Sequence, residues 1–347
     1  SPVVISKDYK GRKACNYCGP IGQNCDRGAR ASSDITYIPE AIKLGAEVRP
    51  NSTVFEITTG DDGRATGANY YNADGEQEFQ PANAVVVGCN GIGTPRMLLH
   101  STSKSHPEGL LNSSGLVGKN LMFHVYAGAS GFFDDLDAPT YRGPLACIIM
   151  SQEFYETDPS RDFKRGYTFQ MGRGQGPAPT ATGGVSWGKN HHAEFAERFG
   201  KNLGLGVIGD DLPEEKNRVE LDTKLTDRYG IPAPKIIYRV GNNSKRLLAH
   251  GVNSARTVLE SAGASRIISS QLSTNAGWHL MGTARMGEDP ALSVVNQYGQ
   301  GHDADNVFIV DGSVFVTGAA VNPTPTIQAL ALRTADYIRH ERSDLKS

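Results

Sequence analysis

The sequence lacks several features that mark whole classes of protein. It has no uninterrupted apolar run of about 18 residues, the length a membrane-spanning helix needs, so no part of the chain is expected to cross a bilayer. Its 35 lysines and arginines nearly balance its 37 aspartates and glutamates, for a formal charge of -2, and no basic stripe interrupts that balance. A nucleic-acid-binding function is therefore not expected.

The chain also lacks an initiator methionine and a basic segment followed by an apolar one. We expect that any targeting signal has been removed or was never part of this chain, so a cytoplasmic and a periplasmic location both stay open. Five cysteines are an odd number in a chain too long to need disulfides, which leaves the redox environment open. The sequons at Asn51, Asn112 and Asn242 are too short to indicate glycosylation.

What is present is a chain of 347 residues, long enough for one large domain or two. Residues 32–44 have the spacing of a capped amphipathic helix, and Gly45 stands where a left-handed cap is needed. Short β-rich runs at residues 46–49, 53–57 and 68–71 predict the strands of a meander.

Residues 84–88, AVVVG, form a continuous apolar run typical of a strand buried on both faces of a parallel sheet. In the following CNGIGTPRMLLHS, Gly91 and Gly93 permit a tight turn and Pro95 suits the first turn of a helix. A helix start at the carboxyl end of a strand favours a phosphate-bearing ligand, although the same residues also fit a plain strand–turn–helix corner.

Residues 123–271 consist of aromatic-containing, β-like segments separated by Gly- and Pro-containing loops, and they are interpreted as a second domain. Strands are predicted at residues 217–222 and 235–240, and the Gly- and Pro-rich residues 172–188 predict a lid, a binding loop or a disordered connection. Residues 244–262 predict a helix. Its apolar positions are Leu247, Leu248, Val252, Ala255, Val258 and Leu259.

Near the C-terminus the strand–loop–helix pattern occurs again. A strand at residues 306–310 ends at Asp311, a glycine-permissive loop covers residues 317–322, and a helix is predicted at residues 326–339 behind Pro323 and Pro325. Two helix starts of this kind favour an anionic cofactor between them.

Three motifs here, HLMGTARMGEDP, VDGSVFVT and NPTPTIQALALRTAD, closely resemble the C-terminal signature of the glucose-methanol-choline (GMC) oxidoreductase family. VVVGCNGIGTPRMLL, GLVGKNLMFH, LPEEKNRVELD and DRYG extend the similarity over most of the chain. The resemblance implies an α/β (α+β) fold, in which a mixed-sheet FAD-binding domain is combined with a substrate domain containing an antiparallel sheet. Residues 1–122 would be a partial FAD-binding domain, residues 123–272 the substrate-binding domain, and residues 273–347 an active-site segment returning to the FAD domain.

The resemblance also implies two polar residues facing the flavin on its substrate side, here His279 and Asn322. Many members have a second histidine, whereas the asparagine of NPTPT is similar to the pyranose-oxidase-like and gluconate-dehydrogenase-like branches. An imidazole can accept the substrate hydroxyl proton while hydride moves to the flavin, and an amide can only orient that hydroxyl. His279 is therefore predicted to be the base and Asn322 its orienting partner. Outside the motif, a core histidine and an Asn-Pro turn would explain both residues.

Further cofactor contacts follow from the same resemblance. Asp311 and Gly312 correspond to a flavin-contacting pair near the pyrophosphate or ribityl chain, with a strand-ending turn as the alternative. Val54 stands where the backbone usually meets the adenine, although strand packing explains it equally well. The remaining implied cofactor contacts are Asn90, Gly91, Asn322, Pro323 and Thr324.

Potential metal ligands are few. His124 and the pair His191–His192 have no further ligands at suitable spacing and are interpreted as structural or surface residues. Cys15, Cys18 and Cys25 could supply three thiolates, but common iron–sulfur clusters take four. A Cys-rich loop without metal is the preferred interpretation, and a three-iron cluster is the alternative.

No strand followed by G-x-G-x-x-G occurs in the sequence, although the family places that FAD fingerprint well upstream. We expect Ser1 to lie inside a longer polypeptide, or the missing part to be a separate chain, and this chain alone to hold FAD poorly.

The predicted reaction is FAD-dependent oxidation of a CH–OH group, a secondary hydroxyl of a sugar, sugar acid or glycoside, with hydride transfer to the flavin. Two alternatives stay open: oxidation of a non-sugar alcohol, and a non-catalytic subunit or fragment that works only with a partner chain carrying the fingerprint. Oxygen, quinone or cytochrome could each be the electron acceptor.

Overall fold

The computed structural model describes residues 4–18, 25–136, 141, 149–174, 176–273 and 277–345. The chain divides into two compact units. Unit 1 comprises Ser1–Val48, Val125–Gly209 and Asn242–Ala276, and unit 2 comprises Arg49–His124, Asp210–Gly241 and Gly277–Ser347. None of the helices in the described ranges is both long and apolar enough to cross a membrane.

Unit 1 is built on a five-stranded sheet. Its order is β11 (Arg266–Ser270), β5 (His124–Phe132), β8 (Asn202–Asp210), β7 (Tyr167–Gly172) and β6 (Met150–Ser151). The pairs β11–β5, β8–β7 and β7–β6 are antiparallel, which agrees with the antiparallel sheet predicted for a substrate domain.

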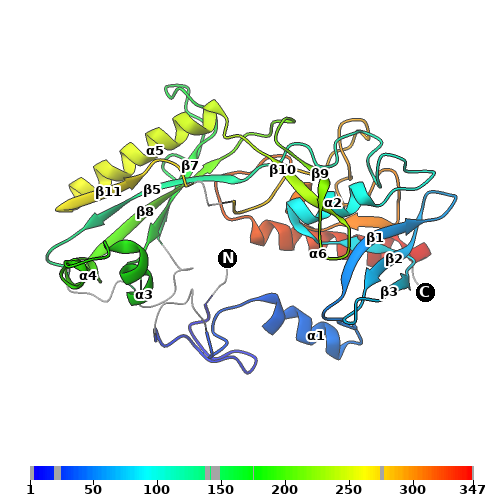
Figure 1. Cartoon of the computed structure of the whole chain (residues 1–347), viewed down its shortest axis with the longest axis horizontal. Coiled ribbons are helices and arrows are strands. Elements are labelled where there is room, and N and C mark those ends of the chain that lie inside the picture. The colour runs from blue at the N-terminus through cyan, green and yellow to red at the C-terminus, as the bar shows by residue number, and fades with distance from the viewer. Residues whose placement is uncertain are drawn as a thin grey trace. The chain divides into compact units, whose positions relative to one another are not determined.

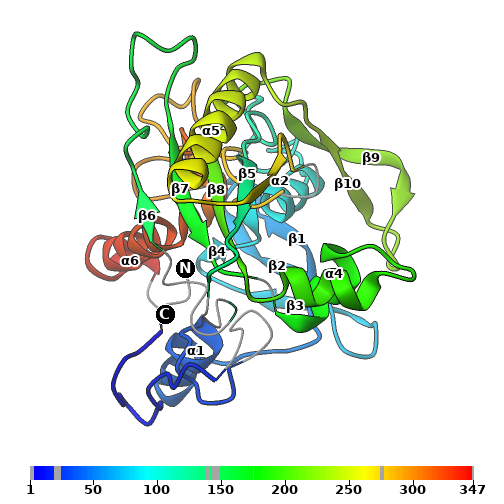
Figure 2. The ribbon, with the colours of Figure 1, turned by 90° about the vertical axis from the view of Figure 1, so that its left-hand side faces the viewer.

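The long helix α5 (Asn242–Ser261) lies across β7 and β8 of this sheet (Figures 1 and 2). It confirms the helix predicted at residues 244–262, except that Val258 at the edge of the apolar stripe is 49% exposed. The close crossing depends on Gly251, where a Cβ atom would lie 2.6 Å from Val207 Cγ1 of β8.

The shorter helices of unit 1 correct two local predictions. The helix predicted at residues 32–44 is divided into η1 (Ser33–Ile35) and α1 (Tyr37–Lys43), and Gly45 follows with the expected positive φ of 99°. Residues 46–49 form no strand, because no neighbouring described strand pairs with them. The Gly-rich segment at 172–188 contains α3 (Pro177–Pro179) and the π-helical turn η2 (Thr180–Gly184), and α4 (His191–Arg198) follows.

Unit 2 contains three small sheets. β1 (Thr53–Thr59), β2 (Ala65–Tyr71) and β3 (Gln77–Pro81) form an antiparallel meander, as predicted, with β3 as an exposed third strand that the sequence did not suggest. β9 (Arg218–Thr226) and β10 (Pro232–Ile237) confirm the two predicted strands, and they pair with each other in an antiparallel ladder. Arg96 on α2 (Asn90–His100) joins this ladder through a 2.7 Å ion pair with Asp227, which places residues 210–241 in unit 2.

The third sheet of unit 2 positions the candidate site. β4 (Val85–Val87) pairs in parallel with β12 (Val307–Ile309), and these strands lead into α2 and into the 3-10 turn η3 (Gly312–Val314). A strand of a parallel sheet was predicted at residues 84–88, but burial on both faces was not correct, because Val86 is 52% exposed in a two-stranded sheet. The chain ends in α6 (Thr324–Glu341) and η4 (Ser343–Leu345).

Candidate functional site

The segment that carries His279 is held by close backbone packing. A Cβ atom on Gly91 of α2 would lie 2.7 Å from the Leu280 carbonyl carbon, and one on Gly312 would lie 2.6 Å from the Leu280 oxygen. Glycine at both positions therefore lets α2 and η3 approach the backbone directly after His279. His279 itself has a positive φ of 62°, a conformation uncommon for a residue with a side chain.

Two further contacts fix this segment. Pro95 lies inside α2 rather than in its first turn, and because it has no N–H, the Gly91 carbonyl one turn earlier is left without its helical donor. Thr283 Oγ1 donates to that carbonyl at 2.9 Å. The backbones of Met122 and Met281 exchange hydrogen bonds at 3.0 and 3.1 Å, which brings the start of β5 beside His279.

The result is a pair of histidines and an amide. His279 Nδ1 lies 2.7 Å from His124 Nδ1, and Asn322 Nδ2 lies 3.4 Å from His279 Nε2. His124 Nε2 lies 3.0 Å from the Gly318 carbonyl oxygen. The two predicted residues, His279 and Asn322, are thus neighbours although 43 residues separate them.

Burial controls the charge of this cluster. Burial, and then the neighbouring His124, lower the pKa of His279 to about 4. Burial also lowers the pKa of His124, partly offset by hydrogen bonds to the backbone of Gly318 and Ala319. Both imidazoles are therefore neutral near pH 7, and His279 is in the form that can accept a proton.

His124 is the residue that the sequence interpretation missed. His124 is only 2% exposed and contacts His279 directly, so of the two interpretations, structural or surface, the structure supports the structural one. A signal was present in the sequence, because His124 ends the motif GLVGKNLMFH. His192 is exposed and His191 half-buried, and no three potential metal-ligating side chains converge within the described residues.

The N-terminus of α2 is closed by the protein itself. The Asp311 carboxylate accepts hydrogen bonds from Asn90 N at 3.0 Å, Thr94 Oγ1 at 2.5 Å and Ser313 N at 2.8 Å. Asn90 Oδ1 accepts from Ile92 N and Gly93 N at 3.0 and 3.3 Å. The phosphate site expected at this helix start is therefore largely filled by a buried carboxylate and an amide oxygen.

The N-terminus of α6 is different. Pro323 is buried at its cap position, Thr324 begins the helix and is exposed, and no described side chain caps the first turn. Asn322 stands immediately before this end. The free N–H groups of a first helical turn favour negative charge, so an electropositive helix end lies beside Asn322 and His279.

Val54 and the cysteines are the remaining residues singled out by the sequence. Val54 is on β1, paired with Tyr70 and 43% exposed. Cys15, Cys18, Cys25 and Cys89 form no disulfide, and Cys147 lies outside the described residues.

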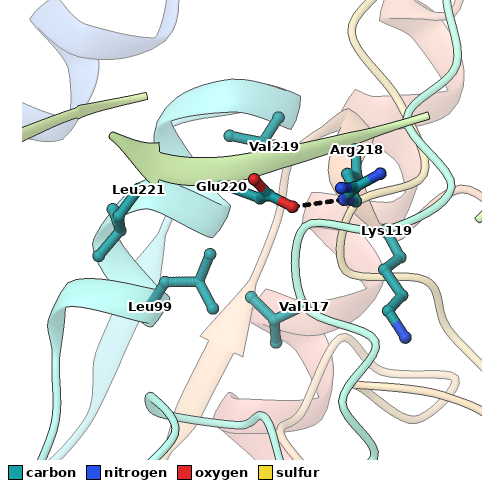
Figure 3. A pocket seen from close by; sticks show the side chains of 7 residues that line it. All are labelled: Leu99, Val117, Lys119, Arg218, Val219, Glu220 and Leu221. Atoms are coloured by element: carbon teal, nitrogen blue, oxygen red, sulfur yellow. Dashed lines mark hydrogen bonds and ion pairs between the residues drawn. The ribbon is translucent and has the colours of Figure 1, made fainter. Parts of the chain in front are cut away.

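Each unit also has a hollow among its described residues. In unit 1 a hollow of about 410 Å³ lies on the sheet face, with Tyr126, Ser130, Arg173 and Asn202 among glycines of β5, β7 and β8. Gly206 leaves room for the Tyr126 ring, since a Cβ there would clash with its hydroxyl. In unit 2 a smaller groove lies over Leu99 and Val117 (Figure 3).

The cations of that smaller groove are already paired. The dashed line in Figure 3 marks the ion pair between Arg218 and Glu220. Arg218 Nε lies 2.5 Å from Glu220 Oε1, and Lys119 Nζ lies 3.6 Å from Glu215 Oε2. None of the predicted site residues lines this groove, so it adds nothing to the cluster around His279.

Comparison with known proteins places the chain in context. Two models of the GMC oxidoreductase family match residues 2–126 and 213–331. The 2-methyl-1,2-propanediol dehydrogenase of Mycolicibacterium austroafricanum is 40% identical over 99% of this chain and 63% of its own length. The fructose dehydrogenase large subunit of Gluconobacter japonicus is 30% identical over 97% of this chain and 61% of its own.

The fold has solved counterparts. The crystal structure of pyridoxine 4-oxidase from Mesorbium loti aligns with a TM-score of 0.57 at 16% identity, covering 83% of this chain and 57% of that one. The chain spans about three fifths of the length of the curated relatives it matches.

Proposed function

Because this chain belongs to the GMC oxidoreductase family, a family of FAD flavoproteins, we propose that it carries the substrate-side active site of an enzyme that oxidises a CH–OH group to a carbonyl. The observation that supports this most directly is the pairing of a neutral, half-buried His279 with Asn322 at the open start of α6.

His279 and Asn322 have separate tasks in this proposal. Nε2 of His279 accepts the proton of the substrate hydroxyl, and Asn322 donates its amide N–H to hold that oxygen in place. The flavin supplies the acceptor for the carbinol hydride. Removing the proton as the hydride leaves avoids a cationic product, a contribution of about 10²- to 10⁴-fold for a positioned base.

The residues around the cluster fit a flavin in a specific way. Asp311 is an anion that already fills the α2 start, so it suits hydroxyl groups of the ribityl chain better than the pyrophosphate. Ser313 Oγ and Asn120 Nδ2 are buried without a hydrogen-bond partner in the described structure and could serve the same polar chain. The uncapped start of α6 favours the negative charge of a reduced flavin.

For the substrate we propose a hydroxyl that has a second hydroxyl on the adjacent carbon. Fructose and 2-methyl-1,2-propanediol, the compounds that name the two relatives, share this feature. A sugar remains our first candidate, and the 40% identity to the diol dehydrogenase favours a small diol as the second.

Flavin bleaching under anaerobic conditions tests the proposal with the flavin-loaded protein. Fructose, gluconate and 2-methyl-1,2-propanediol would be compared, and the diol can release a carbinol hydride only from its primary carbon. We expect at least one polyol to bleach the flavin, and His279→Gln to slow that step by about 10²-fold or more. An unchanged rate in His279→Gln would contradict the assigned base.

Reoxidation is a separate question. Oxygen, a quinone and a cytochrome are all proposed acceptors, and the word subunit in the name of the fructose dehydrogenase relative makes a partner chain a further proposal. Mixing the reduced protein with each acceptor in turn distinguishes the three.

A further inference from the structure

The hydrogen bonds of the His124–His279 cluster run in one direction. The Gly318 carbonyl oxygen can only accept, so His124 must carry its proton on Nε2. In a neutral imidazole the other nitrogen is then an acceptor, and His124 Nδ1 accepts from His279 Nδ1–H at 2.7 Å. A neutral His279 protonated on Nδ1 has a bare Nε2, the atom that faces Asn322.

From this geometry we infer that His124 is a positioning residue that holds His279 in the tautomer with a bare Nε2. The inference rests on the proposed function only for its consequence, since Nε2 is the atom that would accept the substrate proton. Without the acceptor at His124, an imidazole prefers its proton on Nε2, and the base would face the substrate with the wrong atom.

The groups packed around His124 are consistent with this direction. Gly318 and Ala319 contribute backbone carbonyls, which accept only. A Cβ on Gly318 would lie 3.6 Å from His124 Nε2, so the Gly318 backbone packs closely against that nitrogen.

The backbone also contributes. His279 and Ala319 both have positive φ, 62° and 54°, and they lie on the two segments that flank His124. A residue with a side chain keeps this uncommon backbone conformation only where the surrounding structure holds it there. The two rings meet edge to face, with an interplanar angle of 72°.

Two-bond ¹H–¹⁵N spectra of histidine-labelled protein test the inference without flavin or substrate. His279→Gln identifies the His279 resonances. At pH 7 we expect His279 to be protonated on Nδ1 and bare on Nε2, and His124 to show the reverse. A wild-type spectrum with His279 protonated on Nε2 would overturn the inference, whatever the variants do.

The matched variants are His124→Asn and His124→Leu, which have similar shape and differ in having an acceptor oxygen. His124→Asn should keep His279 in the Nδ1–H form, whereas His124→Leu should shift it to the Nε2–H form. In the flavin-loaded protein, flavin reduction should slow by about 10²-fold in His124→Leu and much less in His124→Asn, with KM little changed.

The outcomes separate the two proposals. If His124→Leu folds and His279 keeps its tautomer, the positioning role is wrong. If the spectra show the expected tautomers but no alcohol reduces the flavin of the wild-type protein, the proposed function fails while the inference stands.

Discussion

The starts of α2 and α6 look alike in sequence and differ in the folded protein. Each follows a strand and a glycine-containing loop, and each was predicted as a place for an anion. In the structure α2 is closed by Asp311 and Asn90 Oδ1, whereas α6 has no side-chain cap among the described residues. A helix start is available to an anion only where the protein leaves its N–H groups unpaired, so the two starts are not equivalent.

Removing the carboxylate that closes α2 should have the largest effect. Asp311→Ala leaves Asn90 N, Thr94 Oγ1 and Ser313 N without their acceptor, and we expect the free energy of unfolding to fall by about 2–4 kcal/mol. Denaturant unfolding measures it. Asp303→Ala is the matched control, because Asp303 accepts from Ser113 N and Oγ on the exposed surface. Equal losses in the two variants would show that Asp311 has no special role.

The approach of α2 to the His279 segment gives the next effect. Gly91→Ala places a Cβ 2.7–2.9 Å from the Leu280 and Met281 backbone, which cannot move without displacing His279. We expect a loss of about 1–3 kcal/mol, together with changed His279 resonances in the histidine spectra. Gly183→Ala serves as control, since its Cβ would meet nothing within 4 Å. Unaltered stability in Gly91→Ala would mean that this packing is not tight.

The stability of the protein should depend on pH through His279, which lies beside the open start of α6. Its folded-state pKa of about 4 lies below the ordinary value of 6.5, so between these values the unfolded state binds more protons. The free energy of unfolding should be highest above pH 6.5 and fall by about 2 kcal/mol as the pH drops to 4. Urea midpoints across this range measure the slope, and His279→Gln should flatten it. His192→Gln is the control at an exposed histidine. If the stability of His279→Gln kept the same pH slope as that of His192→Gln, the slope would belong to other titrating groups.

The smallest effect is expected from closing α6. Thr324→Asp adds a carboxylate to its exposed first turn, which should raise the free energy of unfolding by about 0.3–1 kcal/mol. The same charge should weaken flavin binding if the reduced or oxidised ring lies at this end. Flavin titration measures the change in affinity and thermal unfolding measures the change in stability, with Thr324→Asn as the uncharged control. Tighter flavin binding in Thr324→Asp would contradict the proposed place of the ring.

The sequence predicted more of the fold than of the site's interior. The strands β1, β2, β9 and β10 and the helices α2, α5 and α6 follow from local spacing, because each has a period or a breaker that acts within a few residues. The strand predicted at residues 46–49 failed for lack of a partner, and β3 was missed because its residues are polar and exposed. Both outcomes depend on pairing between segments, which local pattern does not contain.

By itself the sequence determined the family, the parallel strand that precedes α2, and the two polar residues His279 and Asn322, because contiguous motifs carry all three. Only the tertiary structure decided that Asp311, 221 residues from Asn90, closes the start of α2. It likewise decided that the start of α6 has no side-chain cap among the described residues. It alone also placed His124 against His279, 155 residues away, and so set the direction of their hydrogen bonds. The physical reason is that capping and tautomer are properties of the partner a group meets in space, and the chain brings those partners from distant segments.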